Sequence, residues 1–247
     1  PCKFEVVDAE AAGRAVEMPT QQGVARMAVS GAQVEGLKPS GQQEVLCVSR
    51  AAWYQPGRGV RGGVTVCWTW FGAGEAGKPA HGFVRTRMWE VRETGQGLAD
   101  SVFIRFGIKD DESTHALWNY AFDLELIVTV GAALKMELVT RNTGTTAFEI
   151  SEGLHTYFHV GEINQTQALG LENTEYLDKV LDFTRHIQNG AVKFTGETDR
   201  VYVDTTSDCV IDDAKLNRKI RIAKLGSTST VVWNPWTEKE KGFADMA

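Results

Sequence analysis

The chain of 247 residues lacks several features that mark common classes of protein. It has no run of five basic residues, and its formal net charge is -6 at pH 7, which disfavours nucleic acid and anionic membranes as partners. No apolar stretch approaches the roughly 18–20 residues that span a bilayer. The first residues show no signal-peptide pattern. We therefore expect a cytoplasmic protein, and we expect any bound anion to be small and held by a few arginines.

Cysteine is scarce, and common catalytic motifs are missing. The four cysteines, at positions 2, 47, 67 and 209, are far apart and form no C-x-x-C, so we expect reduced thiols rather than a disulfide framework. Cysteine and histidine never cluster at ligand spacing, which disfavours a metal site. The sequence has no G-K-[ST], no G-x-S-x-G and no H-E-x-x-H. We therefore expect neither a metal nor a cofactor.

What the chain does contain is a succession of short segments in which apolar and polar residues alternate. Such alternation, rich in Val, Ile, Thr and aromatic residues, is typical of half-buried strands. The expected strands cover residues 24–30, 101–108, 122–130, 133–140, 219–223 and 228–233. Only residues 110–118 suggest a short helix, and no Pro- or Gly-rich linker divides the chain. The sequence therefore predicts an all-β fold of many mostly antiparallel strands, a sandwich or barrel, in one domain over residues 1–247.

Two segments in the first half combine arginine, histidine and aromatic residues. In R-G-G-V-T-V-C-W-T-W-F-G, which starts at Arg61, aromatic faces suit a sugar ring and the arginine suits a phosphate or carboxylate. In H-G-F-V-R, a strand would place His81 and Arg85 on one face. A glycine-rich loop, residues 72–79, joins the two segments. Alternatively, the tryptophans are core residues, the charges are solvated and the loop is a plain hairpin connection.

Two further segments lie in the second half. In E-G-L-H-T-Y-F-H-V, a strand would point His155, Tyr157 and His159 one way, and histidine titrates near neutral pH, as a general acid or base requires. A satisfied structural histidine is the alternative. The segment V-V-W-N-P-W-T-E-K indicates a rigid aromatic turn, for which packing alone is a sufficient account.

Taken in this order, these segments resemble the D-hexose-6-phosphate mutarotases, also called glucose-6-phosphate 1-epimerases, of the aldose 1-epimerase group. The resemblance extends from about residue 24 to residue 246 and includes T-E-Y-L-D-K-V and F-T-G-E-T-D-R-V-Y as well. It implies a galactose-mutarotase-like β-supersandwich. It also implies an isomerase of carbohydrate metabolism that interconverts the anomers of a hexose 6-phosphate by acid–base ring opening, without a metal or cofactor.

The resemblance assigns roles to individual residues of this chain. His155 corresponds to the catalytic histidine, and Arg61 and Arg85 correspond to arginines that bind the sugar phosphate. Asp199 corresponds to a carboxylate that contacts sugar hydroxyls, and His81 is a weaker candidate for the substrate site. The expected partner is the small sugar phosphate, with no nucleic acid and no membrane, and a monomer is favoured.

The sequence departs from the family pattern in two ways. Threonine stands at positions 65 and 69, where the family usually has proline, which restores backbone donors in that strand. The family also continues beyond W-N-P-W-x-E-K to a strand that carries the catalytic glutamate, and this strand is absent from the 247 residues. A clipped sequence is the favoured explanation. The alternatives are a non-catalytic sugar-phosphate-binding protein, or another carboxylate as the base. A mutarotase of free galactose or glucose is disfavoured, because a neutral sugar offers paired arginines no anion.

Overall fold

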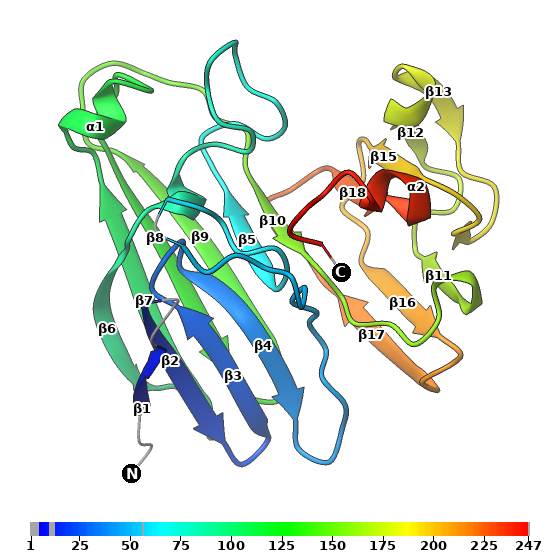
Figure 1. The fold of residues 1–247 in the computed structure, drawn as a ribbon, viewed down its shortest axis with the longest axis horizontal. Helices are drawn as coiled ribbons and strands as arrows, with labels where there is room; N and C mark the ends of the chain where they lie inside the picture. The colour runs from blue at the N-terminus through cyan, green and yellow to red at the C-terminus, as the bar shows by residue number, and fades with distance from the viewer. Residues whose placement is uncertain (1–4, 10–12, 56, 247) are drawn as a thin grey trace. The chain divides into compact units, whose positions relative to one another are not determined.

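The computed structural model describes residues 5–9, 13–55 and 57–246, with side chains described from residue 15 onward. The chain divides into two compact units, residues 1–159 and 160–247, each with its own hydrophobic core. Figure 1 labels the strands of both units. Whether the units act as the single domain expected over residues 1–247 stays a prediction.

The first unit is built from two antiparallel sheets (Figure 1). The first sheet has the order β1-β2-β3-β4-β5-β10 and the second the order β6-β7-β8-β9. The bounds are β1 Glu5–Ala9, β2 Gly13–Thr20, β3 Gly23–Ala28, β4 Gln33–Pro39, β5 Val64–Cys67, β6 Glu90–Gln96, β7 Val102–Lys109, β8 Phe122–Val130, β9 Leu134–Asn142 and β10 Gly153–Thr156, with a 3₁₀ turn η1 at Val84–Thr86 and a short helix α1 at Glu112–His115. The alternation of the sequence thus predicted β7, β8 and β9 closely.

Alternation also explains the core between these sheets. Every second residue of β8, from Phe122 to Val130, is at most 1% exposed, and Val102, Ile104 and Phe106 of β7 are equally buried. They pack against inward-facing side chains of the first sheet, such as Met27 and Val34. Fully burying one such side chain stabilises a fold by about 1.5–3 kcal/mol, so this shared apolar layer is what holds the two sheets together.

The second unit consists of two four-stranded antiparallel sheets, ordered β14-β11-β16-β17 and β13-β12-β15-β18. Its core is smaller and contains Tyr176, Tyr202 and Leu171. The bounds are η2 Ile163–Gln165, β11 Thr166–Leu169, β12 Glu175–Asp178, η3 Lys179–Leu181, β13 Thr184–Ile187, β14 Val192–Lys193, β15 Thr198–Tyr202, β16 Cys209–Asp213, β17 Arg218–Ile222, β18 Thr230–Asn234 and α2 Trp236–Glu240. All pairs of named strands described in both units are antiparallel, which confirms the all-β, mostly antiparallel expectation.

The described residues can be compared with the expectations about cysteines, membrane-spanning helices and metal ligands. Cys47, Cys67 and Cys209 are free thiols, and Cys2 lies outside the described residues. Within the described ranges, no helix is long and apolar enough to cross a membrane. The same ranges contain no group of three or more His, Cys, Asp or Glu side chains arranged to hold a metal ion.

One buried carboxylate in the first sheet lacks full compensation. Glu35 on β4 is 5% exposed, and its Oε1 has no hydrogen-bond partner among the described residues. Its Oε2 lies 3.6 Å from Nε of Arg26, whose side chain is half exposed. Burial raises the pKa of Glu35 above its ordinary value of 4.5, and Arg26 offsets this only in part.

This carboxylate makes the stability of the fold depend on pH. Since the pKa is raised in the fold, the folded state binds more protons, and stability falls as the pH rises from about 4.5 through the raised pKa. Glu35→Gln should therefore raise the melting temperature at pH 8 by roughly 2–4 °C, the shift that about 1 kcal/mol produces in a chain of this size. At pH 4 the variant and the wild type should melt together. Calorimetry at both pH values measures this, with Glu137→Gln, an exposed carboxylate, as the control. A Glu35→Gln protein that is less stable at pH 8 would contradict the interpretation.

Candidate active site

The site is built on the pairing of two strands that are distant in the sequence. β5 and β10 run antiparallel, with His155 opposite Thr65 and Gly153 opposite Cys67. Val64 and Val66 of β5 point into the core of the first unit, so the alternate residues of the pair lie on the other face. His155 is therefore presented, half-buried, on the face of the sheet that the core does not use.

Aromatic rings fix the orientation of His155. The His155 ring stacks on Tyr157, with ring centroids 4.7 Å apart and planes 19° from parallel. His81 meets His155 edge-on at 5.9 Å, and Phe71 meets His81 in the same manner at 4.9 Å. The four rings thus form one row in which both expected histidines lie next to each other. Tyr157 had no role in the sequence-based expectation, although its position two residues after His155 on a strand already placed it on the same face.

His81 does not lie on a strand, and the expectation that His81 and Arg85 share a strand face was wrong. His81 has φ 63° and Gly82 has φ 74°, so the chain turns here in the left-handed region. Glycine is required at position 82, because a Cβ there would lie 1.7 Å from the carbonyl oxygen of Trp68. The local sequence does not report this contact, which exists only in the folded chain.

Gly72 makes one hydrogen bond to the His81 ring and one to its backbone. The Gly72 amide donates to Nδ1 of His81 at 3.2 Å, and the His81 amide donates to the Gly72 carbonyl at 2.6 Å. Because Nδ1 accepts, the neutral ring carries its proton on Nε2.

Arg61 reaches the row of rings from a loop. Its Nη1 donates to the hydroxyl of Tyr157 at 3.4 Å. The two glycines that follow it are required by close backbone approach. A Cβ on Gly62 would lie 2.4 Å from the Cys47 carbonyl oxygen, and one on Gly63 would lie 2.1 Å from the Val34 carbonyl oxygen. The two glycines thus let the backbone pass close to these carbonyls, where a residue with a side chain would clash. This backbone path places Arg61 at the edge of β5.

Arg85 lies in η1 and faces β5 from another direction. Its Nε is buried and has no hydrogen-bond partner among the described residues. Burial raises the pKa of the Cys67 thiol to about 11, and the positive charge of Arg85 acts against this rise, which places the guanidinium near β5. Cys67 is the residue opposite Gly153, two positions before His155. A partly buried arginine with an unused Nε donor at this point suits an anionic ligand.

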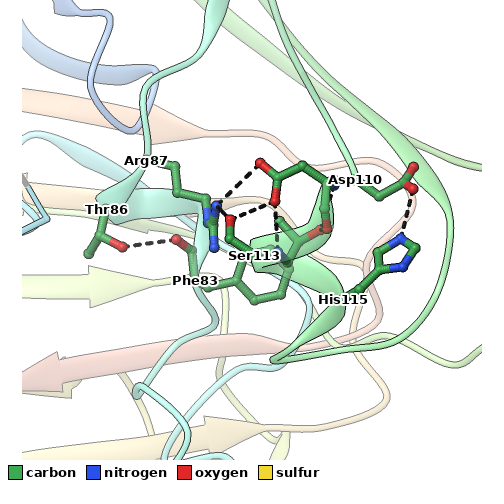
Figure 2. Close-up of polar contacts among 8 residues, drawn as sticks. Phe83, Thr86, Arg87, Asp110, Ser113 and His115 are labelled. Atoms are coloured by element: carbon green, nitrogen blue, oxygen red, sulfur yellow. Dashed lines mark hydrogen bonds and ion pairs between the residues drawn. The ribbon is translucent and has the colours of Figure 1, made fainter.

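Polar contacts anchor the turn that carries Arg85. Arg87, directly after η1, donates to the Ser113 hydroxyl at 2.7 Å and pairs with Asp111 at 3.7 Å. Figure 2 shows these contacts between the turn and α1. Asp111 in turn caps α1 by accepting from the Thr114 amide at 2.8 Å. These contacts of Arg87 thus hold the backbone next to Arg85, and they do not involve the Arg85 guanidinium.

Asp199, the fourth residue assigned by the resemblance, belongs to the second unit. It lies on β15, is 8% exposed and accepts from Nζ of Lys179 at 2.9 Å. The structure therefore brings His155, His81, Tyr157 and Arg61 together within the first unit and places Arg85 against the same pair of strands. The position of Asp199 beside them stays a prediction.

Some aromatic residues that were candidates for sugar stacking have other roles. Trp68 is fully buried, packs against Phe83 and Phe122, and donates from Nε1 to the Thr140 hydroxyl. For Trp68, the core interpretation holds. Part of the glycine-rich loop lines a cavity of about 410 Å³, together with Trp70 and Trp118. Neither expected histidine and neither expected arginine belongs to its lining, so this cavity is not the site described above.

The turn at His81 leads to a stability prediction. Asparagine tolerates the left-handed region and can place its carbonyl oxygen where Nδ1 accepts from the Gly72 amide, whereas alanine does neither. We expect His81→Ala to lower the free energy of unfolding by about 1–2 kcal/mol more than His81→Asn does. Urea unfolding of the two variants measures the difference. Equal stabilities would show that the Gly72 contact does not hold the turn.

The comparisons with known proteins agree with this geometry. A family model described as aldose 1-epimerase matches residues 15–247. An Escherichia coli (strain K12) protein named "Putative glucose-6-phosphate 1-epimerase" is 35% identical over 224 residues, 90% of this chain and 74% of that protein. A Salmonella typhimurium crystal structure described as "a putative mutarotase" has a TM-score of 0.90 at 30% identity, covering 99% of this chain and 84% of that one. A galactose mutarotase-like protein from Lactobacillus casei is only 12% identical but has a TM-score of 0.76, covering 91% of this chain and 84% of that chain. The expected galactose-mutarotase-like fold is thereby confirmed, and the chain belongs to the aldose 1-epimerase family.

Proposed function

We propose that the protein interconverts the α and β anomers of a hexose 6-phosphate, with glucose 6-phosphate as the first candidate. The observation that carries this proposal is an oriented histidine, His155 on β10, with two arginines directed at the same strand pair. Arg61 reaches Tyr157 from the loop before β5, and Arg85 lies in η1 beside β5. A member of the aldose 1-epimerase family needs a proton-transfer group at the anomeric centre. The two arginines add a binding site for a dianionic phosphate, which a free sugar would not require.

The reaction needs only proton transfers. A base takes the proton from the anomeric hydroxyl while an acid gives a proton to the ring oxygen, and the bond between C1 and the ring oxygen breaks. The open-chain aldehyde rotates about the C1–C2 bond, and the ring closes on the other face by the reverse transfers. His155 as the imidazolium supplies the proton to the ring oxygen, because imidazole exchanges protons readily near neutral pH.

The other residues orient the substrate. The stacked ring of Tyr157 keeps the His155 imidazole in one plane, so that its proton is aimed at one atom. His81, whose ring meets that of His155, contacts a sugar oxygen. Arg61 and Arg85 bind the phosphate, and Asp199 accepts from sugar hydroxyls. The sugar-phosphate specificity, the cytosolic location and the favoured monomeric state remain predictions from the sequence.

The base that partners His155 is assigned from the family resemblance alone. The resemblance assigns it to a glutamate on a strand that follows W-N-P-W-T-E-K, and this chain spans 74% of the length of the Escherichia coli relative. Activity is therefore best measured on protein whose C-terminus has been defined by intact mass.

Exchange spectroscopy by NMR tests the reaction directly. The wild-type protein should accelerate the exchange between α- and β-glucose 6-phosphate. His155→Asn should lower the rate constant by about 10²- to 10⁴-fold, the usual contribution of a positioned general acid. Failure of the wild type to exceed the buffer rate would reject the proposed activity, and a fully active His155→Asn protein would reject the role of His155.

Loss of a phosphate-binding arginine should affect kcat/KM for glucose 6-phosphate and for free glucose differently. Arg85→Gln should lower kcat/KM for glucose 6-phosphate by about 10- to 100-fold, because it removes charged hydrogen bonds worth roughly 1.5–3 kcal/mol. The value for unphosphorylated glucose should change little. Arg105→Gln is the matched control, since Arg105 pairs with Glu93 in the β6–β9 sheet. Equal losses on both sugars would argue against Arg85 as a phosphate ligand.

A further inference from the structure

A buried amide lies behind the loop that carries Arg61. Gln33, the first residue of β4, is 1% exposed and is among the largest fully buried side chains of the described residues. Its Nε2 donates to the Val60 carbonyl at 3.0 Å and to the Gly62 carbonyl at 2.6 Å. Both partners are carbonyl oxygens, which can only accept, so the amide nitrogen must face them and both of its protons are used.

The two carbonyls that Gln33 binds belong to the residues on either side of Arg61. The carbonyl of Arg61 itself accepts from the Ser49 amide at 2.9 Å. Three consecutive carbonyls are thus fixed, and the middle one is the carbonyl of the residue that reaches Tyr157. Such bonding holds a non-repetitive loop in one conformation and determines where the Arg61 side chain starts.

The turn that leads into Gln33 also contacts the segment that carries Arg85. The Gly31 amide donates to the Arg87 carbonyl at 2.7 Å. A Cβ on Gly31 would lie 2.6 Å from the Arg85 carbonyl oxygen, so the two backbones are in direct contact. On the other side, the stem of Arg85 runs along Gly59 of the Arg61 loop, where an added Cβ would be 3.7 Å from Cγ and Cδ. The turn between β3 and β4 therefore touches the backbone supports of both arginines.

We propose that Gln33 is a positioning residue for substrate binding, and that Gln33 and the β3–β4 turn before it, residues 29–32, set the spacing between Arg61 and Arg85. This inference rests on the proposed function, because it takes these arginines as the phosphate ligands. Gln33 touches no substrate. It acts by keeping Arg61 at a fixed distance from Arg85, so that one phosphate can bind to both.

The role of Gln33 is not explained by the packing of the core. Its neighbour Val34 faces the apolar core, whereas Gln33 and the alternate residue Glu35 lie on the other face of β4. The pairing of β4 with β3 uses backbone atoms and does not need this side chain. An amide buried at this place costs desolvation, and its two bonds to the Arg61 loop are the visible compensation.

A double-mutant cycle separates positioning from general support of the fold. Gln33→Met keeps the volume but removes both donors, and it should raise KM for glucose 6-phosphate about tenfold with kcat changed by less than about twofold. In an Arg61→Gln background, Gln33→Met should change KM by less than about twofold, because the side chain that it positions is gone. Anomer exchange measured by NMR gives both constants for all four proteins.

The control is Thr166→Val, which removes the hydrogen bond that the hydroxyl of the buried Thr166 donates to the Glu162 carbonyl at 2.8 Å, outside the contacts of Arg61 and Arg85. It should lower the melting temperature as Gln33→Met does but leave KM unchanged. An equal effect of Gln33→Met on KM with and without Arg61 would overturn the proposal, as would a loss of kcat at unchanged KM.

Titration with inorganic phosphate distinguishes failure of this inference from failure of the proposed function. Calorimetry should show phosphate binding that weakens about tenfold in Gln33→Met and in Arg61→Gln, but not further in the double variant. A wild type that binds phosphate in this pattern without accelerating anomer exchange would reject the enzymatic function and keep the role of Gln33. Binding indifferent to Gln33→Met would reject that role even in an active enzyme.

Discussion

The antiparallel pairing of β5 with β10 is the constraint on which the site depends. It places His155 opposite Thr65 and leaves the row of rings on the face that the core does not occupy. The contact between Arg61 and Tyr157, which are 96 positions apart, follows from the same pairing. Without this register, the histidine and the arginine would have no fixed relation. A shift by one residue would turn His155 into the core.

The groups that carry charge are held differently from the group that is expected to transfer protons. His155 lies on a regular strand, whose ladder of hydrogen bonds fixes it. Arg61 and Arg85 lie on irregular segments that depend on hydrogen bonds to individual carbonyls and on close glycine contacts. This division is physically sensible, because long arginine side chains need a precise starting point, whereas a histidine next to the anomeric carbon needs a precise ring plane.

The sequence predicted the fold better than the local structure around the candidate site. Alternation located β7, β8 and β9, since every second residue there faces a deep core. The same reasoning placed His81 and Arg85 on one strand face, which is wrong. Glycine at position 82 is required by a carbonyl of Trp68, and nothing in the five letters H-G-F-V-R reports that contact. Gln33 gave no signal either, because one glutamine at the start of a strand is ordinary until its two carbonyl partners are known.

The long separation between β5 and β10 also has a consequence for the order of folding. Closing a loop of this length costs chain entropy that grows with the logarithm of its length, whereas the hairpins of β6–β9, which lie within the loop, pair neighbouring segments. Those hairpins can form first and shorten the path that the remaining chain must close. We therefore expect the residues of the candidate site to come together after those hairpins have formed, and a nascent chain to expose the edge of β5 until then.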